Sequence, residues 1–189
     1  MLGGTFDPIH VGHLVTGVNV RSELSLDLVL FVVAHDPWQK ADRDVTPSAD
    51  RLAMVAAAVA GHEGLEASAI EIERGGVSYT ADTLAALRSG QPDAELFLIV
   101  GQDQAANLPT WERVDEIRSL ATLVVVHRPG AEGGPVPGPW RQIDVDVPRL
   151  EVSSSDLRAR FADGRPLDWL VPDAVVRLAR ERGLYGRAG

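Results

Sequence analysis

Residues 3–13 read Gly-Gly-Thr-Phe-Asp-Pro-Ile-His-Val-Gly-His. The paired glycines allow backbone angles that are closed to other residues and let a ligand approach the main chain, and Asp-Pro marks a turn. A helix that starts near Gly12 has free backbone N–H groups, which attract anions. Because His10 and His13 are three residues apart, both lie on one side of that helix start. The stretch therefore predicts a loop that clamps phosphate between two imidazoles and a helix N-terminus.

Two other interpretations of these histidines stand beside the phosphate clamp. A zinc site needs a third ligand, and no acidic residue or cysteine stands at a typical spacing from the pair. In the plainest interpretation the histidines only cap the helix and pack against it. The Gly-x-Gly-x-x-Gly and Gly-x-x-x-x-Gly-Lys-Ser/Thr loops of other nucleotide-binding proteins are absent.

Strands and helices alternate along the rest of the chain. Apolar runs and polar–apolar alternation predict strands over residues 27–34, 67–73, 95–101, 122–127 and 142–147. Helical periodicity with cap and stop residues predicts helices over residues 14–24, 48–61, 80–90, 110–120, 153–162 and 172–182. This order predicts an α/β fold with a doubly wound parallel sheet and a small C-terminal helical part. Ligands of such sheets bind beyond the carboxyl ends of the strands.

Length and composition set further limits. The chain has 189 residues and a net charge of −9, and it has no cysteine. An acidic chain lacks the basic stripe that a nucleic-acid partner requires, and the absence of cysteine excludes disulfides and thiol chemistry. No apolar run approaches the ~20 residues that span a bilayer. The first residues show no basic region followed by an apolar one, so we expect no signal peptide. We therefore expect a cytoplasmic protein without membrane contact, and a homo-oligomer is compatible with the sequence.

The start of the chain is short for a central strand. Only Met1 and Leu2 precede the paired glycines, whereas a typical strand has about 5–6 residues. We expect the natural start codon to lie upstream, with a fold that tolerates the stub as the alternative. Otherwise we expect one domain over residues 1–189, with the sheet core in residues 1–150 and the C-terminal helices in residues 151–189.

A second anion site is indicated by residues 152–158, Val-Ser-Ser-Ser-Asp-Leu-Arg. Ser153 is a good N-cap, and Asp156 three residues later completes a capping-box pattern. The helix N-terminus and the serine hydroxyls offer donors, and Arg158 has a planar fork that suits phosphate oxygens. The alternative is an ordinary capped helix with a solvated arginine.

Four stretches together resemble one enzyme family. Residues 3–13 resemble the GGTFDPxHxGH signature of nucleotidyltransferases, and residues 152–158 resemble their ISSTxIR motif. Residues 75–84 resemble a GxSYTxDTL element, and residues 101–111 fit the GxDxxxxxxxW pattern of bacterial nicotinate mononucleotide adenylyltransferases. The resemblance covers almost the whole chain. It implies a Rossmann-like nucleotidyltransferase fold and transfer of the adenylyl group of ATP to nicotinate mononucleotide, with Mg²⁺ bound to ATP.

The resemblance also implies the site residues. Those expected to bind ATP are Gly3, Gly4, Thr5, Phe6, His10, Gly12, His13, Ser153, Ser154 and Arg158. Among them His10, His13 and Arg158 are the expected catalytic residues, and no residue of the protein is expected to hold the metal. The C-terminal helices are expected to complete the ATP site.

Four residues are expected to bind nicotinate mononucleotide. Trp111 offers a flat face to the cationic pyridinium ring, and Thr80 at a helix N-terminus can present its N–H to the carboxylate. Asp103 can accept from ribose hydroxyls, and Lys40 matches a position that meets phosphate. Their plain alternatives are a core tryptophan, a helix cap, a turn and a solvated lysine. His35 is assigned no role, because the loop around it departs from the family pattern.

Other functions stay open at this point. A relative could use nicotinamide mononucleotide or phosphopantetheine as the acceptor, or the chain could bind nucleotide as a sensor without turnover. Phosphopantetheine enzymes usually carry threonine where this chain has His10. The intact set of His10, His13, Ser154 and Arg158 argues against a sensor.

Overall fold

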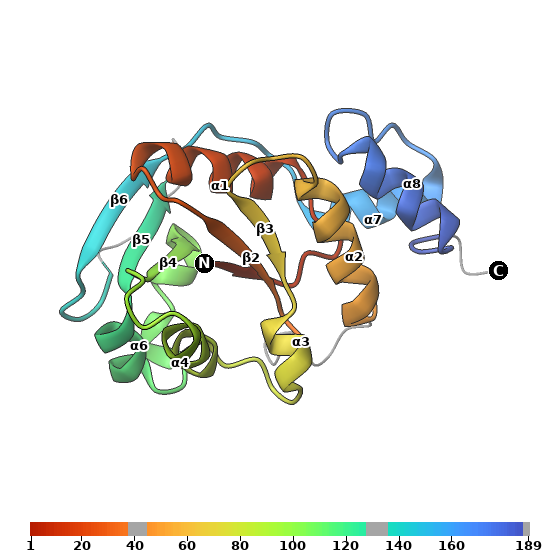
Figure 1. Cartoon of the computed structure of the whole chain (residues 1–189). Helices are drawn as coiled ribbons and strands as arrows, with labels where there is room; N and C mark the ends of the chain where they lie inside the picture. Colours follow the sequence, from red (N-terminus) through yellow and green to blue (C-terminus); the bar gives the residue numbers. More distant parts are fainter. Residues whose placement is uncertain (38–44, 128–135, 187–189) are drawn as a thin grey trace.

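The computed structural model describes residues 1–37, 45–127 and 136–186. Within these ranges one parallel sheet has the strand order β3-β2-β1-β4-β5-β6 (Figure 1). Its strands are β1 (Leu2–Gly4), β2 (Val29–Val33), β3 (Leu65–Ser68), β4 (Phe97–Gly101), β5 (Thr122–His127) and β6 (Gln142–Asp146). The order runs outward in both directions from β1 and β4, so the predicted doubly wound parallel sheet is confirmed.

Helices cover both faces of this sheet. They are α1 (Val11–Glu23), α2 (Ser48–Val59), α3 (Ile70–Arg74), α4 (Thr80–Gly90), α5 (Gln102–Ala105), the 3₁₀ turn η2 (Leu108–Thr110), α6 (Val114–Leu120), α7 (Ser154–Asp163) and α8 (Asp173–Glu181). Ile99 and Val124 join the core beneath α1, α2, α7 and α8. Leu98 and Leu123, one residue earlier in the same strands, join the core beneath α4, α5 and α6. Consecutive residues of β4 and β5 are therefore buried on opposite faces, which explains their continuous apolar runs.

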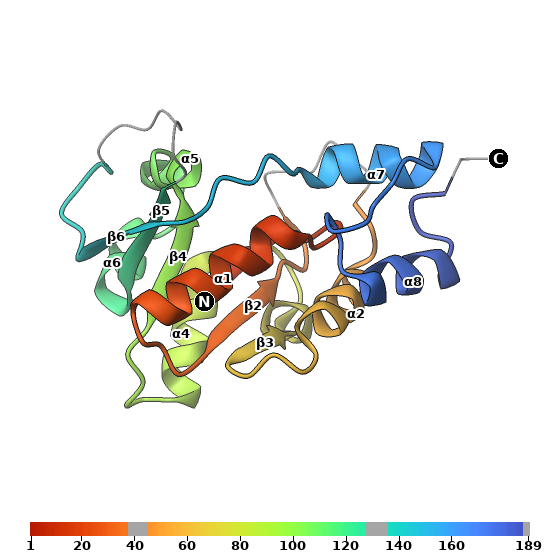
Figure 2. The ribbon, with the colours of Figure 1, turned by 90° about the horizontal axis from the view of Figure 1, so that it is seen from above.

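The C-terminal helices return to the side of the sheet that carries α1 and α2. Figures 1 and 2 show the chain after β6 running past α1 to reach α7, with α8 beside α2. Arg182, just after α8, forms an ion pair with Asp50 of α2 at 2.6 Å. The N-terminus of α7 thereby comes to lie near the loop that follows β1. None of the described helices is long and apolar enough to cross a membrane.

Two predicted elements differ from the structure. The strand expected over residues 67–73 ends at Ser68, and α3 follows it; the Ser68 hydroxyl accepts from the Ile70 N–H at 3.4 Å. The helix expected over residues 110–120 begins only at Val114, because Arg113 has a left-handed φ of 55° that separates η2 from α6. Both differences lie at element boundaries and leave the topology unchanged.

The strand β1 is short and central. All three of its residues pair with β2, whereas toward β4 only Leu2 is in register, opposite Ile99. The Met1 amino group donates to the Phe97 carbonyl at 2.5 Å, and burial lowers the pKa of this amino group to about 5. Because the strand order reverses between β1 and β4, the crevice at their carboxyl ends is the expected ligand site.

Candidate active site

A cavity of about 330 Å³ opens at this reversal point. It is lined by β1 and β4, by single residues of α1, α3, α4, α5 and α7, and by residues of the loops between these elements. The predicted site residues that line it are Gly3, Gly4, Thr5, Phe6, His13, Thr80, Trp111 and Ser154. Stretches as far apart in the sequence as Gly3 and Ser154 are thus gathered around one space.

The two histidines stand at the start of α1. Their rings stack with centroids 3.7 Å apart, and His10 is buried at the N-cap while His13 lines the cavity. The His10 backbone N–H donates to His13 Nδ1 at 3.3 Å. Since Nδ1 accepts this bond, the proton of the neutral His13 ring is on Nε2. His13 therefore has an N–H donor on the ring edge opposite its backbone contact.

The loop between β1 and α1 has a fixed shape. Phe6 adopts a left-handed φ of 50°, and its ring lies over Gly4, where an added Cβ would come within 2.8 Å of it. The same ring contacts His13 edge-on, with centroids 5.0 Å apart. Gly4 is therefore required for Phe6 to pack against His13, which links the glycine of the motif to its second histidine.

The start of α7 is held against this loop. The Ser154 hydroxyl donates to the Pro8 carbonyl at 3.0 Å, and Arg158 donates to the Asp7 carbonyl at 2.7 Å. Ser154 lines the cavity, whereas Gly12, Ser153 and Arg158 do not. The two predicted phosphate-binding stretches are thus joined by direct hydrogen bonds.

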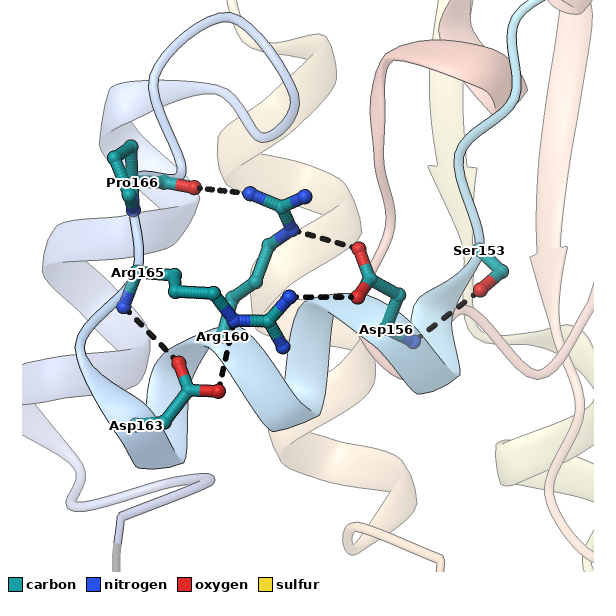
Figure 3. Close-up of polar contacts among 6 residues, drawn as sticks. All are labelled: Ser153, Asp156, Arg160, Asp163, Arg165 and Pro166. Carbon is teal, nitrogen blue, oxygen red and sulfur yellow. Dashed lines mark hydrogen bonds and ion pairs between the residues drawn. The ribbon is translucent and has the colours of Figure 1, made fainter.

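The predicted cap of α7 is present. Figure 3 shows the Ser153 hydroxyl accepting from the Asp156 N–H, at 3.2 Å. The Asp156 carboxylate binds Arg160 at 2.6 Å and Arg165 at 3.3 Å, and the hydrogen bond from Arg160 is the largest cause that lowers the pKa of Asp156. Arg165 also binds Asp163, where its backbone N–H is the main cause of a lowered pKa. This exposed network ties both ends of α7 to the loop that leads to α8.

Thr80 and Trp111 also line the cavity. Thr80 is the first residue of α4, with Tyr79 at the N-cap. The indole Nε1 of Trp111 is buried and has no hydrogen-bond partner among the described residues. Asp103 is exposed on the first turn of α5 and does not line the cavity; its carboxylate is folded back over Gly101. Lys40 lies outside the described residues.

Sequence reasoning missed a buried arginine that contacts the loop between β1 and α1. Arg51 of α2 is 1% exposed and donates to three carbonyl oxygens: Thr46 at 2.7 Å, Thr5 at 2.8 Å and His35 at 3.2 Å. Thr5 and His35 follow β1 and β2, so one guanidinium fixes the ends of two neighbouring strands. Burial lowers the pKa of Arg51, and the charge of Asp7 partly offsets this effect.

Sequence reasoning also missed the role of Tyr185. Its hydroxyl donates to the buried carboxylate of Asp7 at 2.6 Å, and Asp7 also accepts from the Thr46 N–H at 3.3 Å. Burial, and then the hydrogen bond to Asp7, raise the pKa of Tyr185 well above its usual range. Residues from the far C-terminal part of the chain thus hold the turn that follows the paired glycines.

When Tyr185 is replaced with phenylalanine, the free energy of unfolding should decrease less steeply as the pH rises above about 10. The folded protein keeps the phenol protonated, whereas the unfolded chain releases that proton near pH 10. The stability from this group is complete below about pH 10 and is lost as the pH rises further. Urea unfolding of the wild type and of Tyr185→Phe at pH 8 to 11 measures this pH dependence. All other titrating groups are the same in the two proteins, so the difference between them reports Tyr185. If the free energy of unfolding changed with pH in the same way in the wild type and in Tyr185→Phe, the raised pKa of Tyr185 would be contradicted.

Known proteins are similar to this chain over most of its length. Residues 1–160 match the family model described as Cytidylyltransferase-like. A probable nicotinate-nucleotide adenylyltransferase of Corynebacterium kroppenstedtii is 45% identical, covering 100% of this chain and 91% of the relative. One of Streptomyces coelicolor is also 45% identical, covering 97% and 98% of the two chains.

Solved structures share the fold. The Plasmodium falciparum nicotinic acid mononucleotide adenylyltransferase complexed with NaAD aligns with a TM-score of 0.79 at 15% identity, covering 97% of this chain and 95% of that one. At this identity the likeness concerns the fold. Together with the sequence matches over the full length, it shows that this chain belongs to the nicotinate-nucleotide adenylyltransferases of the cytidylyltransferase-like family.

Proposed function

We propose that the chain transfers the adenylyl group of ATP to nicotinate mononucleotide, giving deamido-NAD and pyrophosphate in NAD biosynthesis. The names of its relatives support this activity. The observation that carries it is the lining of one cavity. His13, Ser154, Thr80 and Trp111 all line this cavity. We propose that the first two face the phosphates of ATP, on the phosphate side, and that the last two face nicotinate mononucleotide, on the acceptor side.

The reaction needs no covalent enzyme intermediate, because the nucleophile is already a phosphate. An oxygen of the mononucleotide phosphate attacks the α-phosphorus of ATP in line. The new P–O bond forms as the bond to the β-phosphate oxygen breaks, and that oxygen leaves with pyrophosphate. Catalysis then rests on positioning and on donors aimed at the developing charge.

The donors come from the phosphate side of the site. The Nε2–H of His13 and the N–H groups at the start of α7 supply fixed donors, while His10 orients His13 through ring stacking and a backbone bond. At the start of α1 the Val11 N–H already donates to the Leu170 carbonyl and the His13 N–H to the His10 carbonyl. We propose that Arg158 binds the triphosphate once it moves from the Asp7 carbonyl, and that α7 thereby completes the ATP site. Lys40 remains the proposed contact to the mononucleotide phosphate, and Asp103 to the ribose.

Magnesium is proposed to arrive with ATP. Mg²⁺ commonly keeps several waters and binds substrate phosphates rather than an all-protein cage. Among the described residues no three of His, Cys, Asp and Glu gather to hold a metal ion. The proposal therefore leaves the coordination of Mg²⁺ to phosphate oxygens and water, and its chemical contribution is to neutralise phosphate charge.

The acceptor preference tests this function. The N-terminus of α4 favours the carboxylate of nicotinate over the neutral amide of nicotinamide. We expect pyrophosphate release from ATP to show a higher kcat/KM with nicotinate mononucleotide than with nicotinamide mononucleotide. Equal use of the two acceptors would contradict the assignment of Thr80, and release with phosphopantetheine alone would replace the proposed function.

Two variants of Thr80 locate the cause of the preference. Thr80→Pro removes the N–H donor at a position where helices accept proline, and the extended backbone of Tyr79 suits a following proline. Thr80→Ala keeps that N–H and loses only the side chain. We expect the proline variant to lose most of the preference for the acid and the alanine variant to keep it.

A further inference from the structure

A buried carboxylate lines the acceptor side of the cavity. Glu71 of α3 is 5% exposed, and among the described residues that line this cavity it has the only carboxylate side chain. The Thr83 hydroxyl, which is fully buried in α4, donates to Glu71 Oε1 at 2.6 Å. Neither the transfer chemistry nor the phosphate contacts described above use this residue.

No cation among the described residues forms an ion pair with Glu71. Arg74 is near, but its guanidinium donates to Thr83 Oγ1 at 3.2 Å and to the Val77 carbonyl at 3.4 Å. A buried carboxylate with only a neutral partner is unfavourable unless a positive charge offsets its desolvation. The cavity beside Glu71 is where such a charge would enter.

The acceptor of the proposed reaction carries a positive charge of this kind. Its pyridinium nitrogen is quaternary, so the ring stays cationic at every pH and whether the substituent is an acid or an amide. We propose that Glu71 is a binding residue whose carboxylate is the counter-charge of the pyridinium ring. This inference rests on the proposed function, since it concerns the same acceptor.

The cavity then matches a zwitterion at two points. The N-terminus of α4 faces the carboxylate of nicotinate, and Glu71 faces the cationic ring that stacks on Trp111. Each charge alone would favour a different class of ligand. Together they select a cationic ring that bears an anionic substituent.

Two isosteric variants separate this role from a structural one. Glu71→Gln removes the charge but keeps an oxygen that accepts from Thr83. Thr83→Val keeps the charge and removes the hydrogen bond to α4. If Glu71 only positions α4, Thr83→Val should be the damaging variant, because Glu71→Gln keeps the hydrogen bond. If Glu71 is the counter-charge, only Glu71→Gln should change the binding of the cationic ring.

Equilibrium binding to the full chain decides between the counter-charge role and the structural role of Glu71. Titration calorimetry with nicotinate mononucleotide and with its 1,4-dihydro form compares a cationic ring with a neutral ring on the same ribose phosphate. We expect Glu71→Gln to weaken binding of the cationic form by about tenfold and to leave the neutral form unchanged. Thr83→Val should keep the wild-type ratio between the two forms, and ATP binding should be unaffected in both variants.

An unchanged ratio in Glu71→Gln, or an equal fall of the ratio in Thr83→Val, would overturn the proposal. Melting temperatures report whether each variant folds. If Glu71→Gln does not fold, Glu71→Asp replaces it, because withdrawing the carboxylate by one methylene should also lower the ratio. Failure of the proposed function is seen separately, as the absence of pyrophosphate release from ATP and nicotinate mononucleotide by the wild-type chain.

Discussion

Replacing His13 with alanine should lower kcat for adenylyl transfer by roughly two orders of magnitude or more, the scale of losing one preorganised donor. The His13 ring is held by the stacked His10 ring and by the His10 N–H on its Nδ1, so its Nε2–H is fixed before the substrate arrives. Negative charge on the leaving pyrophosphate grows during transfer, and this donor stabilises that charge more than it stabilises bound ATP. We therefore expect a larger fall in kcat than rise in KM for ATP, measured as pyrophosphate release.

A glutamine at the same position is the matched control. Its side-chain amide nitrogen reaches about as far as Nε2 and can donate a hydrogen bond, so His13→Gln should recover part of the lost kcat. His62 is exposed, its Nδ1 lies 3.3 Å from the Ala60 carbonyl oxygen, and it does not line the cavity, so His62→Ala should keep the wild-type rate. A near-normal kcat in His13→Ala would show that His13 does not stabilise the phosphates during transfer.

The sheet could be predicted because its strands are buried on both faces. Continuous runs such as Val29–Val33 have no solvated side, which leaves little choice but a parallel strand under two layers of helices. The short elements could not be predicted in the same way. In residues 67–73 the apolar alternation runs on through α3, whose five residues are too few for a helical period to show. Arg113 adopts a left-handed conformation that its residue type does not signal.

The site could be predicted where motifs carry it. The motifs place Gly3, Gly4, His13, Thr80, Trp111 and Ser154 in the site, and these residues line one cavity. The contacts of the supporting residues Arg51 and Tyr185 could not be predicted, because the strand order rather than sequence spacing brings their partners near. Glu71 reaches the cavity from a helix that the sequence did not reveal.

The burial of Arg51 can be inferred from the sequence, but its hydrogen-bond partners cannot. It shares a helix face with Met54, Val55 and Ala58, which lie three, four and seven residues later and are all buried. This spacing predicts that the side chain of Arg51 points into the core. The three carbonyl oxygens that receive its hydrogen bonds follow β1, follow β2 and precede α2, and only the folded topology places them together.

Replacing Arg51 with methionine should therefore lower the free energy of unfolding by about 3 kcal/mol or more. Methionine keeps most of the apolar stem but leaves three partly buried carbonyls without a donor, at about 1–3 kcal/mol for each oxygen that water does not reach. It also leaves the buried Asp7 carboxylate without the nearby positive charge. The free energy of unfolding of Arg51→Lys should lie between those of the wild type and Arg51→Met. One ammonium group keeps the charge but cannot span three carbonyls as the planar guanidinium does.

Urea unfolding at neutral pH measures this effect, with Arg180→Met as the control. Arg180 is exposed on α8, and a surface change of this kind usually shifts stability by no more than about 0.5 kcal/mol. The activity of Arg51→Lys, assayed well below its melting temperature, adds a second readout. Because Arg51 holds the Thr5 carbonyl in the loop that lines the cavity, we expect KM for ATP to rise while the protein is still fully folded. If Arg51→Met unfolds at the same urea concentration as Arg180→Met, the guanidinium does not hold the ends of β1 and β2 together. The loop between β1 and α1 is then supported by other contacts.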